Sequence, residues 1–279
     1  MAATVQTVGT YTSSSSATSI DVFMPASIAV GDLLVAHVAG QTNSTSYNTP
    51  AGWTLTRDAS GANSVMAVFH KVAVLADVSA STTTFTTTGS NARISGRILR
   101  INGQRSDFST VMDDANGAAG GSNTTPTSSG FTPSYTDDLI MIFVCAQNSR
   151  TNSTYAIATT PPTFTEHYDD QESNLSISAA SGLRNVDTAT GNATSLLSSA
   201  AFWSIVVIAI SSFENATVTP TVLPVSSSFI NPALLLESNL SPTVLGITSA
   251  IQPETVSVQT NPVWSNLPKD NSVWTNTPK

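Results

Sequence analysis

The sequence has 279 residues, a formal net charge of −8 and only 10% charged residues, the missing charge being replaced by Ser, Thr and Asn. The negative charge opposes nonspecific binding to nucleic acid or to anionic lipid. The scarcity of Glu, Lys and Arg disfavours helices, and a hydrophobic content of 40% in a chain of this length is enough for a real core.

The N-terminal part of the chain consists of short strand patterns. Residues 4–12 and 19–24 predict two strands, with a turn at the four serines 13–16 between them. Gly31 and Asp32 then open the apolar run 33–39, which is bounded by polar residues. An apolar run this short, flanked by turn residues, predicts a strand that is buried on both faces.

Alternating apolar and polar residues follow. The alternation predicts strands over residues 53–57 and 66–72 with a hairpin loop at 58–63, and a β-branched strand at 82–88 anchored by Phe85. No stretch of ten or more residues has a helical period.

The same plan occurs a second time. The run 33–39 has a counterpart in Asp137–Ala146, and the segments that follow each run also correspond, at offsets of roughly 106 to 113 residues. The corresponding pairs are 50–54 with 161–165, 64–72 with 174–183, and 98–101 with 204–210.

The repeat predicts a body over residues 1–213, built from related halves at about 1–115 and 124–213. The glycine-rich run 116–123 between them is predicted to be a flexible linker. The body is expected to be all-β: an antiparallel β-sandwich of two packed sheets, either jelly-roll or immunoglobulin-like.

Beyond the body, prolines interrupt the chain about every ten residues in a C-terminal arm, residues 214–262. A tail at 263–279 is a near-exact decapeptide repeat, residues 263–272 followed by a shorter copy at 273–279. Each proline removes a backbone donor, so the arm cannot lie inside a broad sheet. Its apolar residues are expected to be buried between chains, either in a fibrous, trimeric stalk or along a groove on a neighbouring subunit. The predicted assembly interface is Phe229, Leu234, Leu235, Leu236, Leu240, Val244, Leu245, Ile247, Ile251, Trp264 and Trp274.

No local motif for catalysis, phosphate binding or zinc binding occurs, so we expect no enzyme, no cofactor and no catalytic or metal-binding residue. Cys145 lies in an apolar run and is expected to be a buried, inert thiol. His37 is expected to be a core histidine. A calcium site at Asp169, Asp170 and Glu172 is an alternative to the simpler interpretation of these acids as turn residues.

Four basic residues, Arg93, Arg97, Arg100 and Arg105, lie within thirteen positions and form either a docking face for an acidic partner or a solvated strand face. The N-terminus has no secretory signal, and the longest apolar run, Ala200–Ile210, is about half of a membrane span. These features predict a protein that is made in a cytoplasm and not inserted into a membrane.

A resemblance to known proteins lies in the segments Gly31–Val35, Pro50–Leu55 and Val68–Ala73 and in the proline-interrupted C-terminal segment. In these segments the chain resembles β-sandwich proteins encoded among the virion structural genes of tailed bacteriophages. The resemblance covers most of the chain and implies no catalytic residues. It implies a head-decoration or cement protein, or a head, neck or tail fibre.

The leading expectation is a non-enzymatic structural protein of a phage virion, a homo-oligomer that contacts sister subunits and major capsid or other virion proteins. One alternative is a tail fibre or adhesin that binds a host-surface glycan through Tyr47, Trp53 or Tyr168. A secreted carbohydrate-binding module is the other, disfavoured by the missing export signal.

Overall fold

The computed structural model describes residues 2–41, 46–61, 63–89, 92–105 and 111–212. These residues form antiparallel strands and one five-residue helix, which confirms the predicted all-β class for this part of the chain. The elements are β1 (Thr4–Val8), β2 (Thr12–Ala17), β3 (Ser19–Phe23), β4 (Leu33–Gln41), β5 (Tyr47–Asn48), β6 (Thr54–Ser60), β7 (Val65–Val72), α1 (Leu75–Ser79), β8 (Thr82–Thr87), β9 (Ala92–Asn102), β10 (Met112–Asn123), β11 (Thr127–Ser128), β12 (Asp138–Gln147), β13 (Asn152–Ile157), β14 (Thr165–Glu172), β15 (Leu175–Arg184), β16 (Ala193–Leu197) and β17 (Ala201–Ile210).

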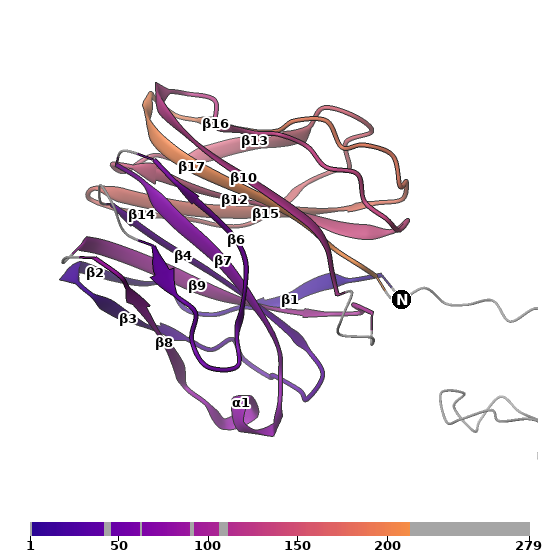
Figure 1. Ribbon diagram of the computed structural model, residues 1–279, viewed down its shortest axis with the longest axis horizontal. Helices are drawn as coiled ribbons and strands as arrows, with labels where there is room; N and C mark the ends of the chain where they lie inside the picture. Colours follow the sequence, from indigo (N-terminus) through magenta and orange to yellow (C-terminus); the bar gives the residue numbers. More distant parts are fainter. Residues whose placement is uncertain (1, 42–45, 62, 90–91, 106–110, 213–279) are drawn as a thin grey trace, which may run out of the picture. The chain divides into compact units, whose positions relative to one another are not determined.

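The strands form four sheets in the described residues, where the sequence predicted two. The first half contains a large sheet, β1-β9-β4-β7-β6 with β2 also on β9, and a small sheet, β3-β8-β5. The second half contains the large sheet β10-β17-β12-β15-β14 and the small sheet β11-β16-β13. Figure 1 shows the sheets as successive layers, with the two large sheets in the middle and a small sheet on each outer side.

The two halves have the same strand order, so the repeat found in the sequence is also a repeat of topology. Within each half, early strands pair with late ones: β1 with β9, β3 with β8 and β4 with β7 in the first, and β10 with β17, β11 with β16 and β12 with β15 in the second. The pairings of the first half are therefore repeated in the second.

The central strands β4 and β12 are buried on both faces, as predicted. Along β12, Leu139, Met141 and their alternate neighbours face the cluster between the halves, while Ile140 and Ile142 face the small sheet. A strand with apolar residues at every position needs a packed layer on each side, which is why the protein has more than two layers.

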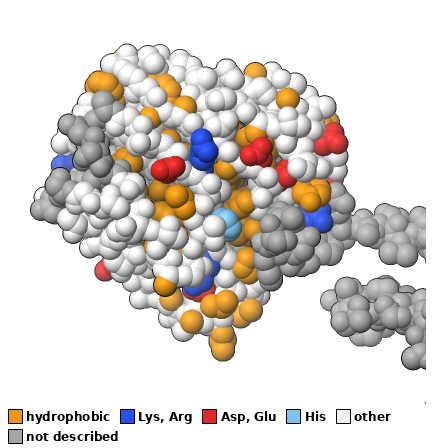
Figure 2. Space-filling model, in the orientation of Figure 1, with side chains coloured by type: hydrophobic (Ala, Val, Ile, Leu, Met, Phe, Trp, Pro, Cys, Tyr) orange, Lys and Arg blue, Asp and Glu red, His pale blue; other side chains and the backbone are white. Residues whose placement is uncertain are grey.

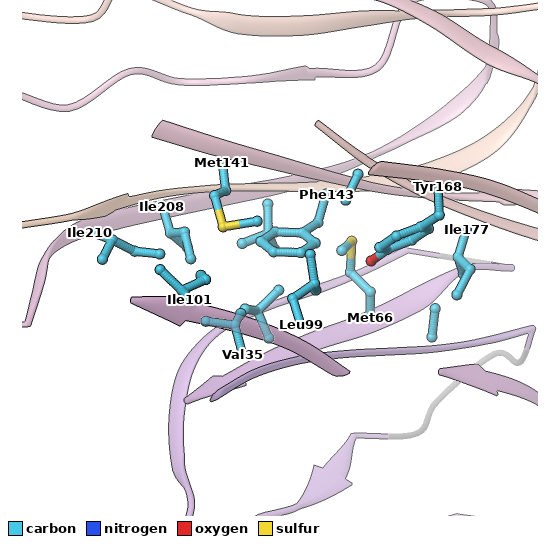
Figure 3. Close-up of a cluster of buried hydrophobic side chains, with 14 of the residues drawn as sticks. Val35, Met66, Leu99, Ile101, Met141, Phe143, Tyr168, Ile177, Ile208 and Ile210 are labelled. Atoms are coloured by element: carbon cyan, nitrogen blue, oxygen red, sulfur yellow. The ribbon is translucent and has the colours of Figure 1, made fainter. Parts of the chain in front are cut away.

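The cluster between the large sheets joins the two halves into one body. Its side chains come from both large sheets and point toward one another (Figure 3). The labelled members are Val35, Met66, Leu99 and Ile101 from the first half, and Met141, Phe143, Tyr168, Ile177, Ile208 and Ile210 from the second.

The glycine-rich run 116–123 is not a linker, which corrects the sequence-based prediction. It lies in β10 and pairs along β17, so the boundary between the halves falls between β9 and β10. Glycine is needed here because a β-carbon at Gly120 would lie 2.2 Å from Cζ2 of Trp203. The indole lies against this strand at Gly120, and only a residue without a side chain leaves room for it.

Two other local predictions also need correction. Residues 13–16 are not a turn, since they lie in β2, where Ser13 and Ser14 pair with β9 and a bulge or irregularity follows. The predicted hairpin loop 58–63 begins later, because β6 continues to Ser60. The turn before β6 has the residues that a β-turn requires. Gly52 adopts a positive φ of +78°, and the Trp53 amide donates to the Pro50 carbonyl at 3.1 Å.

Candidate functional site

The described residues contain no group of three or more His, Cys, Asp or Glu side chains that could hold a metal ion. The three acids of the calcium alternative are engaged elsewhere. Asp170 pairs with Arg97, Glu172 accepts a hydrogen bond from Ser13 at 2.9 Å, and Asp169 accepts one from the Asn152 amide at 3.2 Å. These separate contacts favour structural roles for the acids over a shared cation.

The histidines are structural. His37 is fully buried between the halves, where its Nδ1 lies 2.8 Å from the Tyr168 hydroxyl, and burial lowers its pKa to about 3. A histidine held neutral in the core is what the sequence predicted. The geometry ties a ring on β4 to one on β14, so this contact also joins the two halves.

The other two histidines each bond a hydroxyl on the neighbouring strand, and the strand that carries the histidine differs between the two halves. In the first half His70 on β7 bonds Thr56 on β6 at 2.8 Å, and in the second half His167 on β14 bonds Ser181 on β15 at 2.7 Å. Thr56 and His167 each lie at the bulge of their strand pair. The same imidazole–hydroxyl contact is therefore made twice with its partners swapped, and burial lowers the pKa of both rings.

Cys145 is buried in the cluster between the halves, as expected for an inert thiol. Burial raises its pKa to about 12, which keeps it protonated at neutral pH and removes the nucleophilic thiolate.

The four clustered arginines serve contacts within the chain. Arg97 forms a two-pronged ion pair with Asp170, with one of its bonds at 2.7 Å, and lies between the rings of Tyr11 and Tyr168. Arg93 reaches Glu172 at 3.5 Å. These two pairs run from β9 to β14, from one half to the other.

Arg100 and Arg105 also contact this chain. Arg100 pairs with Asp32 at 2.6 Å, and Arg105 lies 4.3 Å from the centre of the Tyr135 ring. The predicted docking face for an acidic partner therefore consists largely of side chains that already contact this chain. Holding the body together is the role that their geometry supports.

A buried carboxyl lies where β17 ends. Asp138 is 1% exposed, and burial together with the neighbouring Asp113 carboxyl raises its pKa to about 8. The Ser212 amide and Arg105 oppose this shift. Asp138 is thus a protonatable core group next to the last described residues of the body.

The three aromatics of the glycan-binding alternative are all buried. Tyr47 and Tyr168 are each 6% exposed and Trp53 is 7% exposed, with the Trp53 ring in edge contact with Phe85. They are core residues, and none presents a ring face that could stack on a sugar.

One exposed apolar surface stands out at the end of the first half, around α1. We call it the apolar tip, and it consists of Phe23, Val30, Val74, Leu75 and Val78. Figure 2 shows hydrophobic side chains gathered at the end of the body where Figure 1 draws α1. The sequence analysis missed this surface because a five-residue helix is too short to produce a helical period.

No protein-family model, curated protein or solved structure matches this chain. The site must therefore be interpreted from its own geometry. In the part of the chain that the structure describes, no helix has the length and apolar character needed to cross a membrane.

The predicted assembly interface, Phe229 to Trp274, lies outside the described residues. The last described residue, Ser212, is fixed within the body: it bridges to Gln104, and its hydroxyl accepts a hydrogen bond from the Ala3 amide at 2.9 Å. The structure thus defines the position of the last described residue before the arm.

Proposed function

We propose that this chain is a non-enzymatic structural protein of a bacteriophage particle that decorates or cements the head, or forms a head or neck fibre. The body projects outward, and the C-terminal arm joins it to sister subunits or to the underlying shell. The chain would be made in the host cytoplasm and found in the virion.

The observation that carries this proposal is the duplicated, fully packed body. We propose that each half is a jelly-roll sandwich, because its first and last strands pair and the strands inside them nest in the same way. Jelly rolls are recurrent in viral capsid proteins and in lectins. The inner surfaces of both large sheets are used against each other, which leaves a rigid block suited to bearing load.

The chemistry of the side chains supports a structural part over an enzyme or a glycan receptor. The ion pairs Arg97–Asp170 and Arg93–Glu172 are used in contacts between the halves, and Cys145 and His37 are buried in uncharged forms. Lectins share the jelly roll, but Tyr47, Trp53 and Tyr168 are all buried, so no observation favours the adhesin alternative.

The composition of the arm supports its role in assembly. It carries large apolar residues between its prolines, and burying each is worth about 1.5–3 kcal/mol. A dozen such burials against other chains can offset the conformational entropy lost when an extended segment becomes ordered.

Truncation tests the proposal. A chain that ends at Phe213 keeps every strand of the body and should unfold at nearly the same temperature as the full chain. By sedimentation velocity it should be a monomer, while the full chain forms oligomers. A chain that ends at Pro262 is the matched control, because it lacks only the tail and keeps the arm. Equal assembly by the Phe213 truncation and the full chain would contradict the proposal.

A further inference from the structure

The apolar tip is a protruding surface with no counterpart in the second half. Leu75 is 78% exposed and Val30 is 63% exposed, values far above those of the core. At the equivalent place in the second half, the connection from β15 to β16 has the polar sequence NVDTATGN and forms no helix. The tip is therefore a specific addition to one copy of the repeat, as expected for a binding surface.

Backbone contacts hold the tip in place. The Gly31 amide donates to the Ala73 carbonyl at 2.9 Å, and the Ala73 amide donates to the Asp32 carbonyl at 2.8 Å, which places Val30 beside Val74. At the other end of α1, the Met24 amide donates to the Ser81 carbonyl at 2.9 Å and brings Phe23 alongside.

The tip carries no uncompensated charge among its described neighbours. Asp77 in α1 accepts hydrogen bonds from Lys71 at 2.6 Å and from the Val74 amide at 2.8 Å, so both charged groups are paired. The nearby Asp32 is paired with Arg100. The partner that fits such a surface is apolar and nearly uncharged.

The size of the tip favours a peptide segment over a globular partner. Its five side chains expose roughly 500 Å², near the upper limit for a single apolar patch on a monomer. A stable contact between two globular surfaces needs about 800 Å² from each partner. An extended segment with a few large apolar residues needs less and can wrap around the protruding helix.

The last described residue of the body is linked to the edge of the tip. Ser212 bridges to Gln104, and the Gln104 side-chain amide donates to the Gly31 carbonyl at 2.6 Å, next to Val30. Two contacts therefore connect the last described residue of the body to the edge of the tip. Across residues 214–253 only Glu214 and Glu237 are charged, which matches the uncharged surface.

Building on the proposed function, we propose that the apolar tip receives the C-terminal arm, residues 214–262, of a neighbouring copy of this chain. Since the arm follows Ser212 in the sequence and Ser212 is linked to the edge of the tip, two copies that meet at this end can exchange arms. Such an exchange gives each copy the same contacts and creates a bond between them. The tip of one copy and the arm of the other then form the contact between the two copies.

Cross-linking of the full chain tests where the arm binds. A photo-reactive phenylalanine analogue replaces Leu75, and equal amounts of light- and heavy-isotope protein are mixed, unfolded and refolded together before irradiation. The expected result is cross-linked peptides from residues 214–262 that pair light with heavy chains. Pairs of a single isotope only would show that each arm covers its own tip and would overturn the proposal. Cross-links to body peptides alone, or no cross-link to protein, would also overturn it.

Substitutions on the tip give a second measurement. The double variant Leu75→Gln, Val78→Gln changes exposed residues, so the body should fold normally while the association of the full chain weakens at least about tenfold. Leu196→Gln, at an exposed leucine on β16, is the matched control and should associate like the wild type.

The outcomes separate this inference from the proposed function. If the Phe213 truncation abolishes assembly but the tip double variant assembles normally, the arm joins copies at another surface and only the tip proposal fails. If the truncation assembles like the full chain, the proposed function itself fails.

Discussion

Replacing Gly120 by alanine tests whether the glycine-rich run is a packed strand or a linker, because the two alternatives predict opposite signs. In the structure the new methyl group would lie 2.2 Å from Cζ2 of Trp203, and 2.6 and 2.7 Å from two more atoms of the same ring. Carbon atoms in contact normally lie about 3.5–4.0 Å apart, so the ring must move by more than about 1 Å.

The Trp203 ring has little freedom to move. It is 6% exposed, it belongs to the cluster under the small sheet, and its Nε1 donates to Asn123 at 2.9 Å. Forcing an extra methyl group into such a place costs about 1–3 kcal/mol of the free energy of unfolding. In a flexible linker the same substitution would stabilise by about 0.4–1 kcal/mol, through the entropy of the unfolded chain.

Urea unfolding followed by tryptophan fluorescence and by circular dichroism measures the difference. Gly121→Ala is the matched control, because a β-carbon there has no atom within 4 Å. We expect Gly120→Ala to unfold at a lower urea concentration than the wild type, and Gly121→Ala to be unchanged or slightly more stable. Equal midpoints for the two variants would refute the packing argument.

Three further predictions concern the polar groups of the body. Arg97→Ala should cost about 2–4 kcal/mol of unfolding free energy, because it leaves Asp170 partly buried without its partner, and adding Asp170→Ala should recover part of this loss in a double-mutant cycle. The pKa of Asp138, raised to about 8 in the folded state, gives stability that is fully present below about pH 4 and is lost as the pH rises through 8. The lowered histidine pKa values change the stability only below about pH 6.5. Between pH 6.5 and 8 the free energy of unfolding of the wild type should therefore fall by up to about 1.4 kcal/mol per pH unit, and Asp138→Asn should remove this fall. A free energy of unfolding that still falls with pH in the variant would contradict the assignment. Cys145 should not react with a thiol reagent at pH 8 in the folded protein and should react fully in denaturant, whereas rapid reaction of the native protein would show that the thiol is accessible.

The sequence predicted those features that repeat along the chain itself. Runs such as 33–39 are apolar at successive positions, which is enough to predict a strand with both faces covered. The same pattern contained the signal for four layers, because two strands buried on both faces require covering sheets beyond a single sandwich. The nature of Cys145 and His37 as core residues followed from their apolar neighbours.

The missed features depend on contacts between distant segments. The strand character of β10 depends on its pairing with β17, some eighty residues away, where the Trp203 ring fills the space that Gly120 leaves open. The inner role of Arg97 depends on Asp170, which β14 brings across from the other half. A charge cluster on one strand gives no information about the strand that will face it, so both possibilities remained open in the sequence.

The central claim is that this chain is a part of a phage particle, attached through its arm. Immunogold labelling tests it most directly, with antibodies raised against residues 1–212 and applied to particles purified from a lysate of the organism that encodes the chain. We predict regularly spaced label on the head or neck of intact particles. Particles without label, together with free chain in the soluble fraction, would contradict the account.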